Sequence, residues 1–383
     1  MYLKSLHLRQ FRNYKDCLVN FDAPKTILLG NNAQGKSNLL EAVELLSTLK
    51  SHRSARDREL VLETTPIAEI RATLERTYGS VELGLTLRTQ GRRTVALNQE
   101  SLRRQLDFLG ILNAVQFSSL DLELVRGAPE RRRAWLDSIL TQLEPIYAYI
   151  LQQYNQVLRQ RNALLKKIRK LQQEGEVDAS VSKQYNAELG LWDAQLATAG
   201  SRVTRRRDRM LKRLAPLAQA WHASISGKTE VLDITYAPNV SLSKDDPDLV
   251  KQAFLEKIKQ YSIPEFHQGR TLVGPHRDDV QFTINQTPAK SYGSQGQQRT
   301  LVLALKLAEL KLIEEVVGEP PLLLLDDVLA ELDLNRQNLL LDAIQDRFQT
   351  LITTTHLGAF DSQWLNSSQI LSVQAGEIKR LQA

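Results

Sequence analysis

The stretch Gly30-Asn31-Asn32-Ala33-Gln34-Gly35-Lys36-Ser37 matches the pattern G-x-x-x-x-G-K-[ST]. The apolar run at residues 26–29 before it is typical of a buried strand, and residues 37–49 after it carry apolar side chains at helical spacing. In this strand-loop-helix context the glycines let the backbone wrap around phosphate groups. The backbone amides at the start of the helix point at those phosphates, and the positive end of the helix dipole lies there too. The motif therefore predicts a phosphate site.

Two side chains of the motif have specific roles in this prediction. Lys36 would neutralise the outer phosphates of a nucleotide, and the Ser37 hydroxyl would ligate Mg²⁺. The alternative is a glycine-rich turn that only caps the helix. The predicted nucleotide-binding residues of this stretch are Gly30, Asn31, Asn32, Ala33, Gln34, Gly35, Lys36, Ser37 and Asn38.

A second motif is the run of four leucines at residues 322–325 followed by Asp326 and Asp327. A buried strand that ends in carboxylates can deliver one of them to the metal beside a phosphate loop and the other to attacking water. We therefore expect Asp326 to hold Mg²⁺ and Asp327 to act as general base. The alternative is a buried strand that ends in an acidic helix cap.

A third motif is Ser294-Gln295-Gly296-Gln297, which follows a Tyr-Gly turn and precedes a long helical pattern. Its backbone amides and the Ser294 hydroxyl would face outward at a helix N-terminus, where an anion binds well. A simple N-cap is the alternative. The candidate anion-binding residues are Ser294, Gly296 and Gln297.

The order of patterns along the chain predicts an α/β head interrupted by a helical arm. Strand-like and helical segments alternate over residues 1–127, long heptad-like helical stretches fill residues 128–265, and strands alternating with helices resume over residues 266–383. Residues 172–180 would link two arm helices into an antiparallel hairpin. Because neither flanking segment has enough elements for a covered parallel sheet, we expect both to build one head with a mixed sheet.

Composition and charge narrow the class of protein. With 42% hydrophobic and 25% charged residues among 383, the chain is typical of a globular protein. Its lone cysteine, Cys17, and the absence of a signal-like N-terminus or a long apolar run favour a reducing cytosol and exclude membrane insertion. The net charge is +6, yet residues 159–170 and 202–213 together hold 13 basic residues and one acid. The positive field is therefore local.

Taken together, these motifs and Ala330-Glu331-Leu332-Asp333 resemble the Walker A, signature, Walker B and D-loop elements of the SMC-like ABC ATPases. The chain is further similar to the RecF family of that branch. The stretches that carry this resemblance are residues 11–14 (FRNY), 51–53 (SHR), 121–125 (DLELV), 272–279 (LVGPHRDD), 293–300 (GSQGQQRT) and 325–328 (LDDV).

The resemblance implies an ATP-dependent DNA clamp of recombinational and replication-gap repair and of the SOS response. It implies that the protein recognises gapped or junction DNA, forms a homodimer on ATP, and helps RecO and RecR load RecA, within the cytoplasm at the nucleoid. Each ATP would lie between the phosphate loop of one subunit and Ser294 of the other. Asp327 stands where most ABC ATPases have glutamate, so we expect slow hydrolysis.

Further site residues rest on the resemblance alone. Gln116 would be a Mg²⁺-sensing Q-loop residue, His356 a switch histidine, Arg12 and Asn13 neighbours of the nucleotide base, and Asp333 the D-loop carboxylate. The alternatives are a strand-end amide for Gln116, a surface-loop histidine for His356 and a satisfied edge-of-sheet pair for residues 12 and 13.

Duplex DNA would meet the local basic stretches, which lack the interleaved aromatic residues that stack on single strands. A solvated helix face, or helix packing for residues 131–133, is the alternative. The candidate DNA-binding residues are Arg131, Arg132, Arg133, Lys166, Lys167, Arg205, Arg206 and Arg207. Two other functions remain open, namely the ATPase subunit of an ABC transporter and a non-catalytic nucleotide-binding scaffold.

Overall fold

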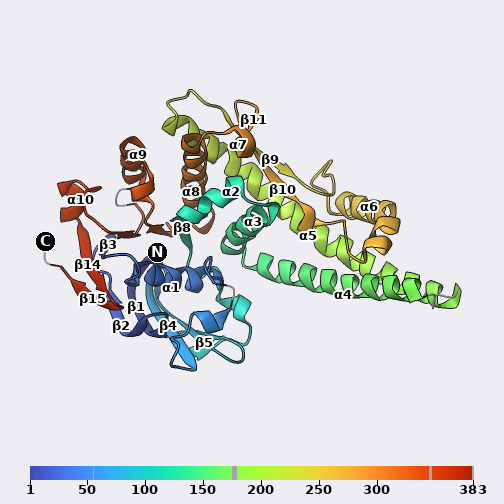
Figure 1. The fold of residues 1–383 in the computed structure, drawn as a ribbon, viewed down its shortest axis with the longest axis horizontal. Coiled ribbons are helices and arrows are strands. Elements are labelled where there is room, and N and C mark those ends of the chain that lie inside the picture. Colours follow the sequence, from blue (N-terminus) through green and yellow to red (C-terminus); the bar gives the residue numbers. More distant parts are fainter. Residues whose placement is uncertain (55, 175–178, 345–346, 382–383) are drawn as a thin grey trace.

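A parallel sheet assembled from both ends of the chain forms the centre of the head in the computed structural model (Figure 1). The structure describes residues 1–383 except 55, 175–178, 345–346 and 382–383. The strand order is β15-β14-β3-β13-β12-β8, and all strands but β15 are parallel to their neighbours. The strands are β3 (Lys25–Leu29), β8 (Ala114–Ser118), β12 (Leu322–Asp326), β13 (Thr350–Thr354), β14 (Ser368–Gln374) and β15 (Glu377–Arg380).

This sheet confirms that the head begun before the arm is completed after it. The strands β3 and β8 precede the arm in sequence, whereas β12, β13 and β14 follow it. The apolar run of β12 is buried along its whole length because helices cover both faces of the sheet. The expected α/β head with a mixed sheet is therefore confirmed.

An antiparallel sheet packs on the other side of helix α1 (Lys36–Thr48). Its alternating apolar residues, among them Leu6, Ile70 and Leu85, share one core with Leu39 and Leu46 of α1. The helix that starts at the phosphate loop is thus held between two sheets. The strands are β1 (Tyr2–Phe11), β2 (Tyr14–Asn20), β4 (Ile67–Arg76), β5 (Gly79–Arg88), β6 (Thr94–Leu97) and β7 (Glu100–Ser101).

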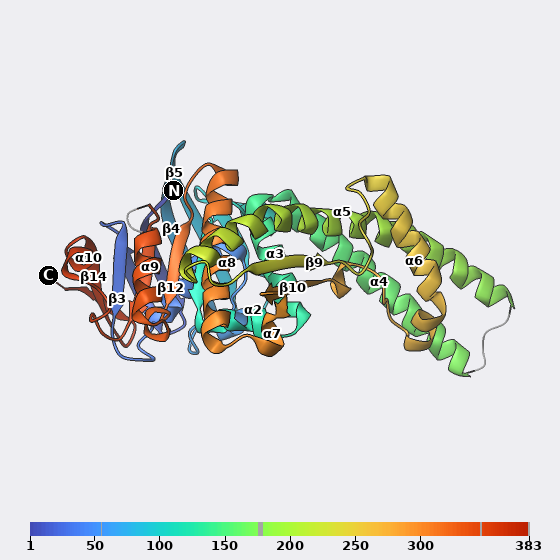
Figure 2. The same cartoon turned by 90° about the horizontal axis from the view of Figure 1, so that it is seen from above.

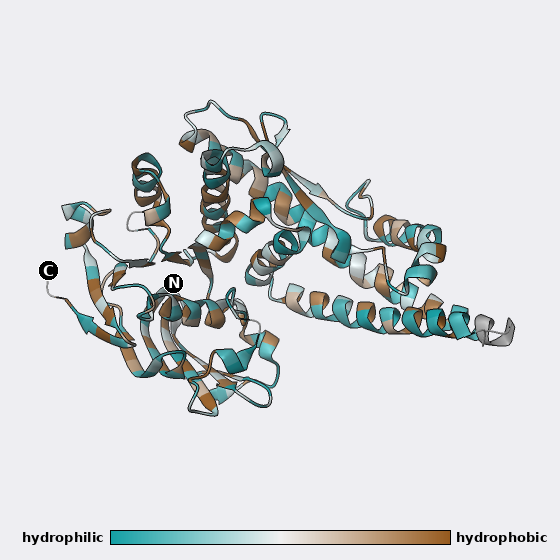
Figure 3. Cartoon of the chain, in the orientation of Figure 1, coloured by the Kyte–Doolittle hydropathy of each residue, from teal (hydrophilic) through white to brown (hydrophobic). Residues whose placement is uncertain are grey.

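Helices α3 (Pro129–Leu143), α8 (Gln295–Val317) and α9 (Leu334–Ile344) pack into the core on the opposite face of the parallel sheet. Hydrophobic residues are concentrated in the sheet strands and in α8, as Figure 3 shows. The remaining short elements are η1 (Asp57–Glu59), η2 (Gln105–Phe108), η3 (Ser119–Leu122), α2 (Glu123–Arg126), η4 (Pro275–Arg277), α7 (Ala289–Tyr292), η5 (Leu329–Glu331) and α10 (Ser362–Asn366).

The arm consists of α4 (Ile146–Glu174), α5 (Ala179–Ile225) and α6 (Pro247–Gln268), and α4 and α5 extend away from the head (Figure 2). The heptad-like helical pattern predicted for this stretch is confirmed, since Tyr154, Leu165, Leu196 and Val203 are buried in α4 and α5. At 29 residues, α4 is about 44 Å long. The predicted linker, residues 172–180, lies partly outside the described residues. Its first residues, 172–174, and its last residues, 179–180, are helical.

Two features of the insertion were missed by the sequence analysis. The helix α5 runs 47 residues and packs on α8 of the head. The strand β9 (Leu232–Ala237) lies within the insertion and pairs with β10 (Asp279–Ile284), which also pairs with β11 (Thr287–Pro288). The arm and the head therefore share one core, and the division at residues 128 and 266 stays a prediction.

Candidate functional site

The loop between β3 and α1 has a backbone that two glycines make possible. Gly35 caps α1 with φ at 117°, a conformation that favours glycine. A Cβ at Gly35 would lie 2.7 Å from the Asn13 side chain, and one at Gly30 would lie 2.3 Å from the carbonyl oxygen of Val373. The close approach of two other segments therefore excludes a larger residue at either position.

Lys36 places a cation at the centre of this loop. Its Nζ donates to the carbonyl oxygens of Gly30, at 2.7 Å, and Asn31, at 3.0 Å. The residue is only 4% exposed. Since a buried charge is weakly screened, the ammonium would attract a phosphate strongly.

Asp326 lies directly beside the loop, at the end of β12. The Ser37 Oγ donates to Asp326 Oδ1 at 2.7 Å, and the Thr353 Oγ1 donates to the same oxygen at 2.8 Å. Asp326 and Thr353 are also paired in register on adjacent parallel strands. One carboxylate and two hydroxyl oxygens are hard ligands of the kind that Mg²⁺ prefers, so these residues fit the predicted metal.

Asp327 follows in a left-handed backbone conformation, with φ at 54°. Its N–H donates to Thr353 Oγ1 at 2.9 Å. Burial raises the pKa of Asp327 above its usual range, an effect that Lys36 opposes and the adjacent Asp326 increases. A carboxyl group with a raised pKa is a better proton acceptor than an ordinary aspartate.

Asn13, in the turn before β2, and Tyr14, the first residue of β2, support the phosphate loop. Asn13 Nδ2 donates to the Gln34 carbonyl at 2.9 Å, and its Oδ1 accepts from Asn38 Nδ2 at 2.8 Å. The Tyr14 hydroxyl donates to the Gly35 carbonyl at 2.9 Å. The amide of Asn13 is therefore engaged in holding the loop, a role that sequence reasoning did not identify.

Arg12 makes a bidentate ion pair with Glu41 of α1, with Nε–Oε2 at 2.9 Å and Nη2–Oε1 at 2.7 Å. Glu41 is fully buried, so the pair joins the turn after β1 to α1 inside the head. This arrangement matches the alternative of a satisfied structural pair. A contact of Arg12 with the nucleotide stays a prediction.

Gln116 lies in the interior of β8 rather than at its end. In the sheet register it is level with Leu324, whereas Ser118 is level with Asp326. Its Nε2 lies 3.3 Å from His52 Nε2, and its buried Oε1 has no hydrogen-bond partner among the residues that the structure describes. His52 in turn hydrogen-bonds Glu44 at 2.6 Å. The Mg²⁺-sensing role of Gln116 stays a prediction.

His356 is exposed in the loop after β13, where its backbone forms hydrogen bonds with the Thr354 hydroxyl. The loop therefore presents the imidazole to solvent. A switch role for His356 also stays a prediction.

The Ser294 turn caps α8 on a different surface of the head. Ser294 Oγ accepts from the Gln297 N–H at 3.2 Å, and Gln297 Oε1 accepts from the Ser294 N–H at 2.8 Å. Ser294 is exposed. Within the described residues, none of the hydrogen bonds of this turn reaches the phosphate loop, so Ser294 is free to meet an external anion.

Asp333 is connected to the same turn through Arg336 of α9. Arg336 forms an ion pair with Asp333 and donates to Thr300 Oγ1 at 2.9 Å and to the Gly296 carbonyl at 3.2 Å. The predicted D-loop and the predicted signature are therefore connected by hydrogen bonds into one surface. The spacing of residues in the sequence carries no signal of this connection.

Several candidate DNA-binding arginines are engaged in ion pairs. Arg207 is 3% exposed and bonds Asp137 at 2.9 Å and Asp278 at 3.4 Å. Arg132 is likewise buried and bonds Asp279 at 2.6 Å. The Arg132 pair joins α3 to β10, which matches the alternative of helix packing for residues 131–133. The buried Arg207 pair joins α5 of the arm to the head and differs from the solvated helix face that was the alternative there.

The other candidates differ in how far they are neutralised. Three of them form ion pairs: Arg133 with Glu130, Arg205 with Asp245, and Arg206 with Glu144. The exposed candidates with no ion pair in the described part of the chain are Arg131, Lys166 and Lys167. A contact of any of these residues with DNA stays a prediction.

Comparison with known proteins agrees with this geometry. The model of the RecF/RecN/SMC N terminal domain family matches residues 2–379. Two proteins named DNA replication and repair protein RecF are close relatives. The protein from Gloeothece citriformis is 69% identical over 382 residues, which cover 99% of this chain and 100% of the relative. The protein from Nostoc punctiforme is 71% identical over 378 residues, which cover 99% of each chain. The chain belongs to the RecF family.

Solved structures extend this result. A structure of the recombination mediator protein RecF-ATPrS in the RecFOR pathway is 32% identical to this RecF-family chain, with a TM-score of 0.89 over 100% of this chain and 98% of that chain. An Smc head domain from Pyrococcus furiosus, 15% identical with a TM-score of 0.54, shares the fold. The RecF family lies in the SMC-like ABC ATPase superfamily. In the described part of the chain, no helix is long and apolar enough to cross a membrane.

Proposed function

We propose that this RecF-family chain is an ATP-dependent DNA-binding clamp of recombinational and replication-gap repair. Two copies would close on ATP, each nucleotide lying between the phosphate loop of one copy and the Ser294 turn of the other. The observation that carries the proposal is the exposure of Ser294 on a surface whose hydrogen bonds, among the described residues, do not reach the loop of its own chain. A second copy would supply the missing contact.

ATP and Mg²⁺ are the proposed cofactors. Lys36 and the amides at the start of α1 would hold the phosphates, while Ser37 and Asp326 would hold Mg²⁺, which when bound supplies positive charge to the phosphate oxygens. Asp327 would accept the proton of the attacking water, and its raised pKa supports that role. Gln116 and His356 are proposed to sense the metal and the γ-phosphate.

Hydrolysis is proposed to be slow and to release the clamp. Asp327 is one methylene shorter than glutamate and has an unusual backbone conformation, so it must position water through different geometry. The shared network of Asp333, Arg336 and Gly296 would move as a unit when the two copies separate. Slow turnover suits a switch that waits on DNA.

The proposed partners are duplex DNA with a gap or junction, a second copy of the chain, RecR and RecO, and indirectly RecA. The name RecFOR pathway, given to the similar RecF-ATPrS structure, supports the proposed RecO and RecR partners. The proposed location is the cytoplasm, at the nucleoid.

Sedimentation mass with and without ATP and Mg²⁺ tests the composite site. We expect the unmodified chain to dimerise only with ATP. Ser294→Arg should remain monomeric, because the long arginine side chain would occupy the space that the phosphate needs. Ser241→Arg, an exposed serine on the arm, is the matched control and should dimerise normally. A mass that is independent of ATP in all three proteins would contradict the clamp.

Two other functions predict different results. A transporter ATPase subunit would associate with a membrane partner and show no DNA-dependent behaviour. A non-catalytic scaffold would bind ATP, yet Asp327→Asn would change neither its turnover nor its residence time on DNA. A drop in turnover for Asp327→Asn in the purified protein would contradict the scaffold.

A further inference from the structure

A cavity of about 780 Å³ lies where the arm meets the head, and neither the phosphate loop nor the Ser294 turn contributes to it. The segment after α1, strand β8, η2 and α3 line it from the head, and α4 lines it from the arm. Its wall includes Gln116 and His52. A ligand here would therefore contact the arm and the predicted metal-sensing strand at once.

Unneutralised positive charge gathers at this cavity. Lys50, Arg131 and Arg159 line it, all three are exposed, and none has an ion pair in the part of the chain that the structure describes. The only lining carboxylate that lacks an ion pair, again among described residues, is Glu123. Among the lining groups without an ion pair, the cations therefore outnumber the carboxylates, which favours contact with an anion at the exposed rim.

The other charged groups in the lining are engaged in ion pairs. Arg93 pairs with Asp57, and Lys306 bonds Asp121 at 3.0 Å and Glu309 at 3.4 Å. Glu44 bonds His52 at 2.6 Å. These pairs leave the three exposed cations as the main source of the local field.

The positive surface continues along α4. The cavity-lining residues of α4 include Ala148, Asn155 and Arg159, which fall on one face of the helix. Lys166 comes 18 residues after Ala148, five whole turns, so it lies on the same face and is exposed. Arg159 and Lys166 are about 10 Å apart along the helix, close to three base-pair steps of duplex DNA.

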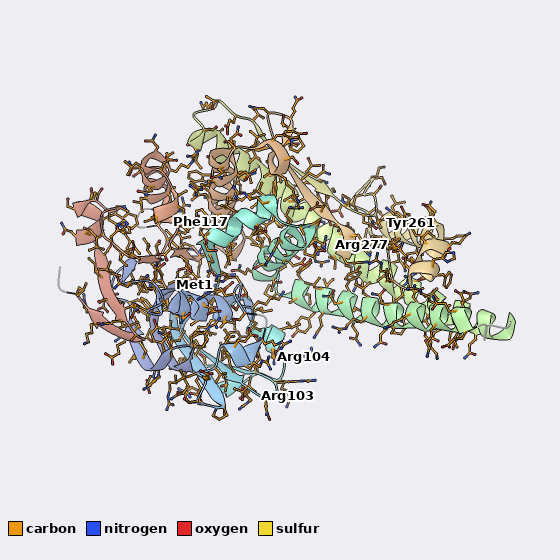
Figure 4. All side chains as sticks on the ribbon, in the orientation of Figure 1. Met1, Arg103, Arg104, Phe117, Tyr261 and Arg277 are labelled. Carbon is orange, nitrogen blue, oxygen red and sulfur yellow. The ribbon has the colours of Figure 1, made fainter. Side chains whose placement is uncertain are left out.

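The head supplies the opposite side of this surface. Figure 4 shows Arg103 and Arg104 on the head, below the first turns of α4 in this view. The Arg104 guanidinium lies 6.0 Å from the ring of Tyr149 on α4, and the next residue, Gln105, lines the cavity. Cations thus flank a groove formed by the cavity and the exposed face of α4 beside it, and an extended polyanion fits that arrangement.

We propose that this groove binds the phosphate backbone of duplex DNA, with Lys50, Arg131 and Arg159 as contact residues. The inference rests on the proposed function and names its DNA-binding site. A duplex is favoured over a single strand because Trp135, the aromatic residue in the cavity wall, is only 6% exposed and cannot stack on bases. By contrast, Arg207 and Arg132 would have to leave buried ion pairs to contact DNA.

The test exchanges the three cations together, as Lys50→Gln, Arg131→Gln and Arg159→Gln, and measures binding of a fluorescently labelled gapped duplex at rising salt. We expect affinity at low salt to fall at least about tenfold and the slope of log affinity against log salt to shrink by about 3. Thermal unfolding of the variant checks that it is folded.

A matched control removes the same charge elsewhere. Lys15, Lys244 and Lys259 are exposed and have no ion pair among the described residues, and they do not line the cavity. Their triple exchange to Gln should leave the slope nearly unchanged. Equal effects in the two triple variants would mean that only net charge matters and would overturn the proposed groove.

Two further outcomes also overturn the groove. One is an unchanged salt slope in the cavity variant. The other is unchanged DNA binding together with lost binding of a polyglutamate probe, which would assign the groove to an acidic peptide. If the unmodified chain itself fails to bind any duplex, then the proposed function fails and not merely this placement of the site.

Discussion

Ser37 Oγ lies 2.7 Å from Asp326 Oδ1, although the two residues are 289 positions apart in the sequence. The contact exists because β3 and β12 both flank β13 in a parallel sheet, which brings their carboxyl ends to one edge. Phosphate and metal ligands of α/β proteins gather at this edge. The whole arm is inserted between the two halves of the site without disturbing it.

The first prediction concerns the metal. Asp326→Asn should remove most of the Mg²⁺-dependent gain in ATP affinity, by about tenfold or more, because the neutral amide cannot compensate a divalent charge. Binding of a fluorescent ATP analogue with Mg²⁺ and with EDTA measures it. Asp342→Asn, an exposed aspartate on α9, is the control and should behave as the unmodified chain. Equal Mg²⁺ dependence in both variants would refute the assignment.

The second prediction concerns the proton acceptor. Asp327→Asn should lower turnover by roughly a hundredfold or more, since loss of a general base costs that much. Burial raises the pKa of Asp327, so protonation should switch turnover off at a higher pH than an ordinary aspartate would. The pH profile of phosphate release measures both effects. A rate that stays constant down to the usual aspartate range would count against Asp327 as the base.

The third prediction separates structural from DNA-binding arginines. Arg207→Gln should lower the free energy of unfolding by about 3–5 kcal/mol, because it leaves Asp137 and Asp278 buried without a cation. Urea unfolding measures this loss. Arg213→Gln, at an exposed arginine of the same helix, should change stability by less than about 0.5 kcal/mol. Equal stability of the two variants would show that the Arg207 pair is not structural.

The fourth prediction concerns acid stability at the junction of arm and head. The His276 ring accepts from the Tyr154 hydroxyl at 2.6 Å, lies 3.1 Å from the Thr271 carbonyl, and burial lowers its pKa to about 4. The unfolded chain therefore takes up this proton first. Stability is lost as pH falls from about 6.5 towards 4, by about 3 kcal/mol over the whole range and about 2 kcal/mol by pH 5.

His276→Gln tests this expectation, because it removes the titrating group. Urea unfolding at pH 7 and at pH 5 should show a smaller loss for the variant than for the unmodified chain. The difference between the two proteins isolates His276 from other groups that titrate in this range. Parallel losses would show that His276 does not contribute.

Local patterns were sufficient to predict the motifs and the elements that carry them. The phosphate loop, the leucine run before Asp326 and the capping turn at Ser294 each depend on a few consecutive residues, whose backbone preferences act at short range. The strand β9 was missed although Leu232, Ile234 and Tyr236 alternate as in a strand, because helical patterns surround it.

The sequence by itself determined the family, the α/β head with its inserted arm, and the residues that meet at the phosphate site. Only the tertiary structure decided that Arg12 and Arg207 are held in ion pairs. It also decided that Lys50 and Arg159 line one cavity. The register of β8 places Gln116 level with Leu324. The physical reason is distance along the chain. Propensity and periodicity are local, whereas burial and charge pairing depend on which remote segments the packed core brings together.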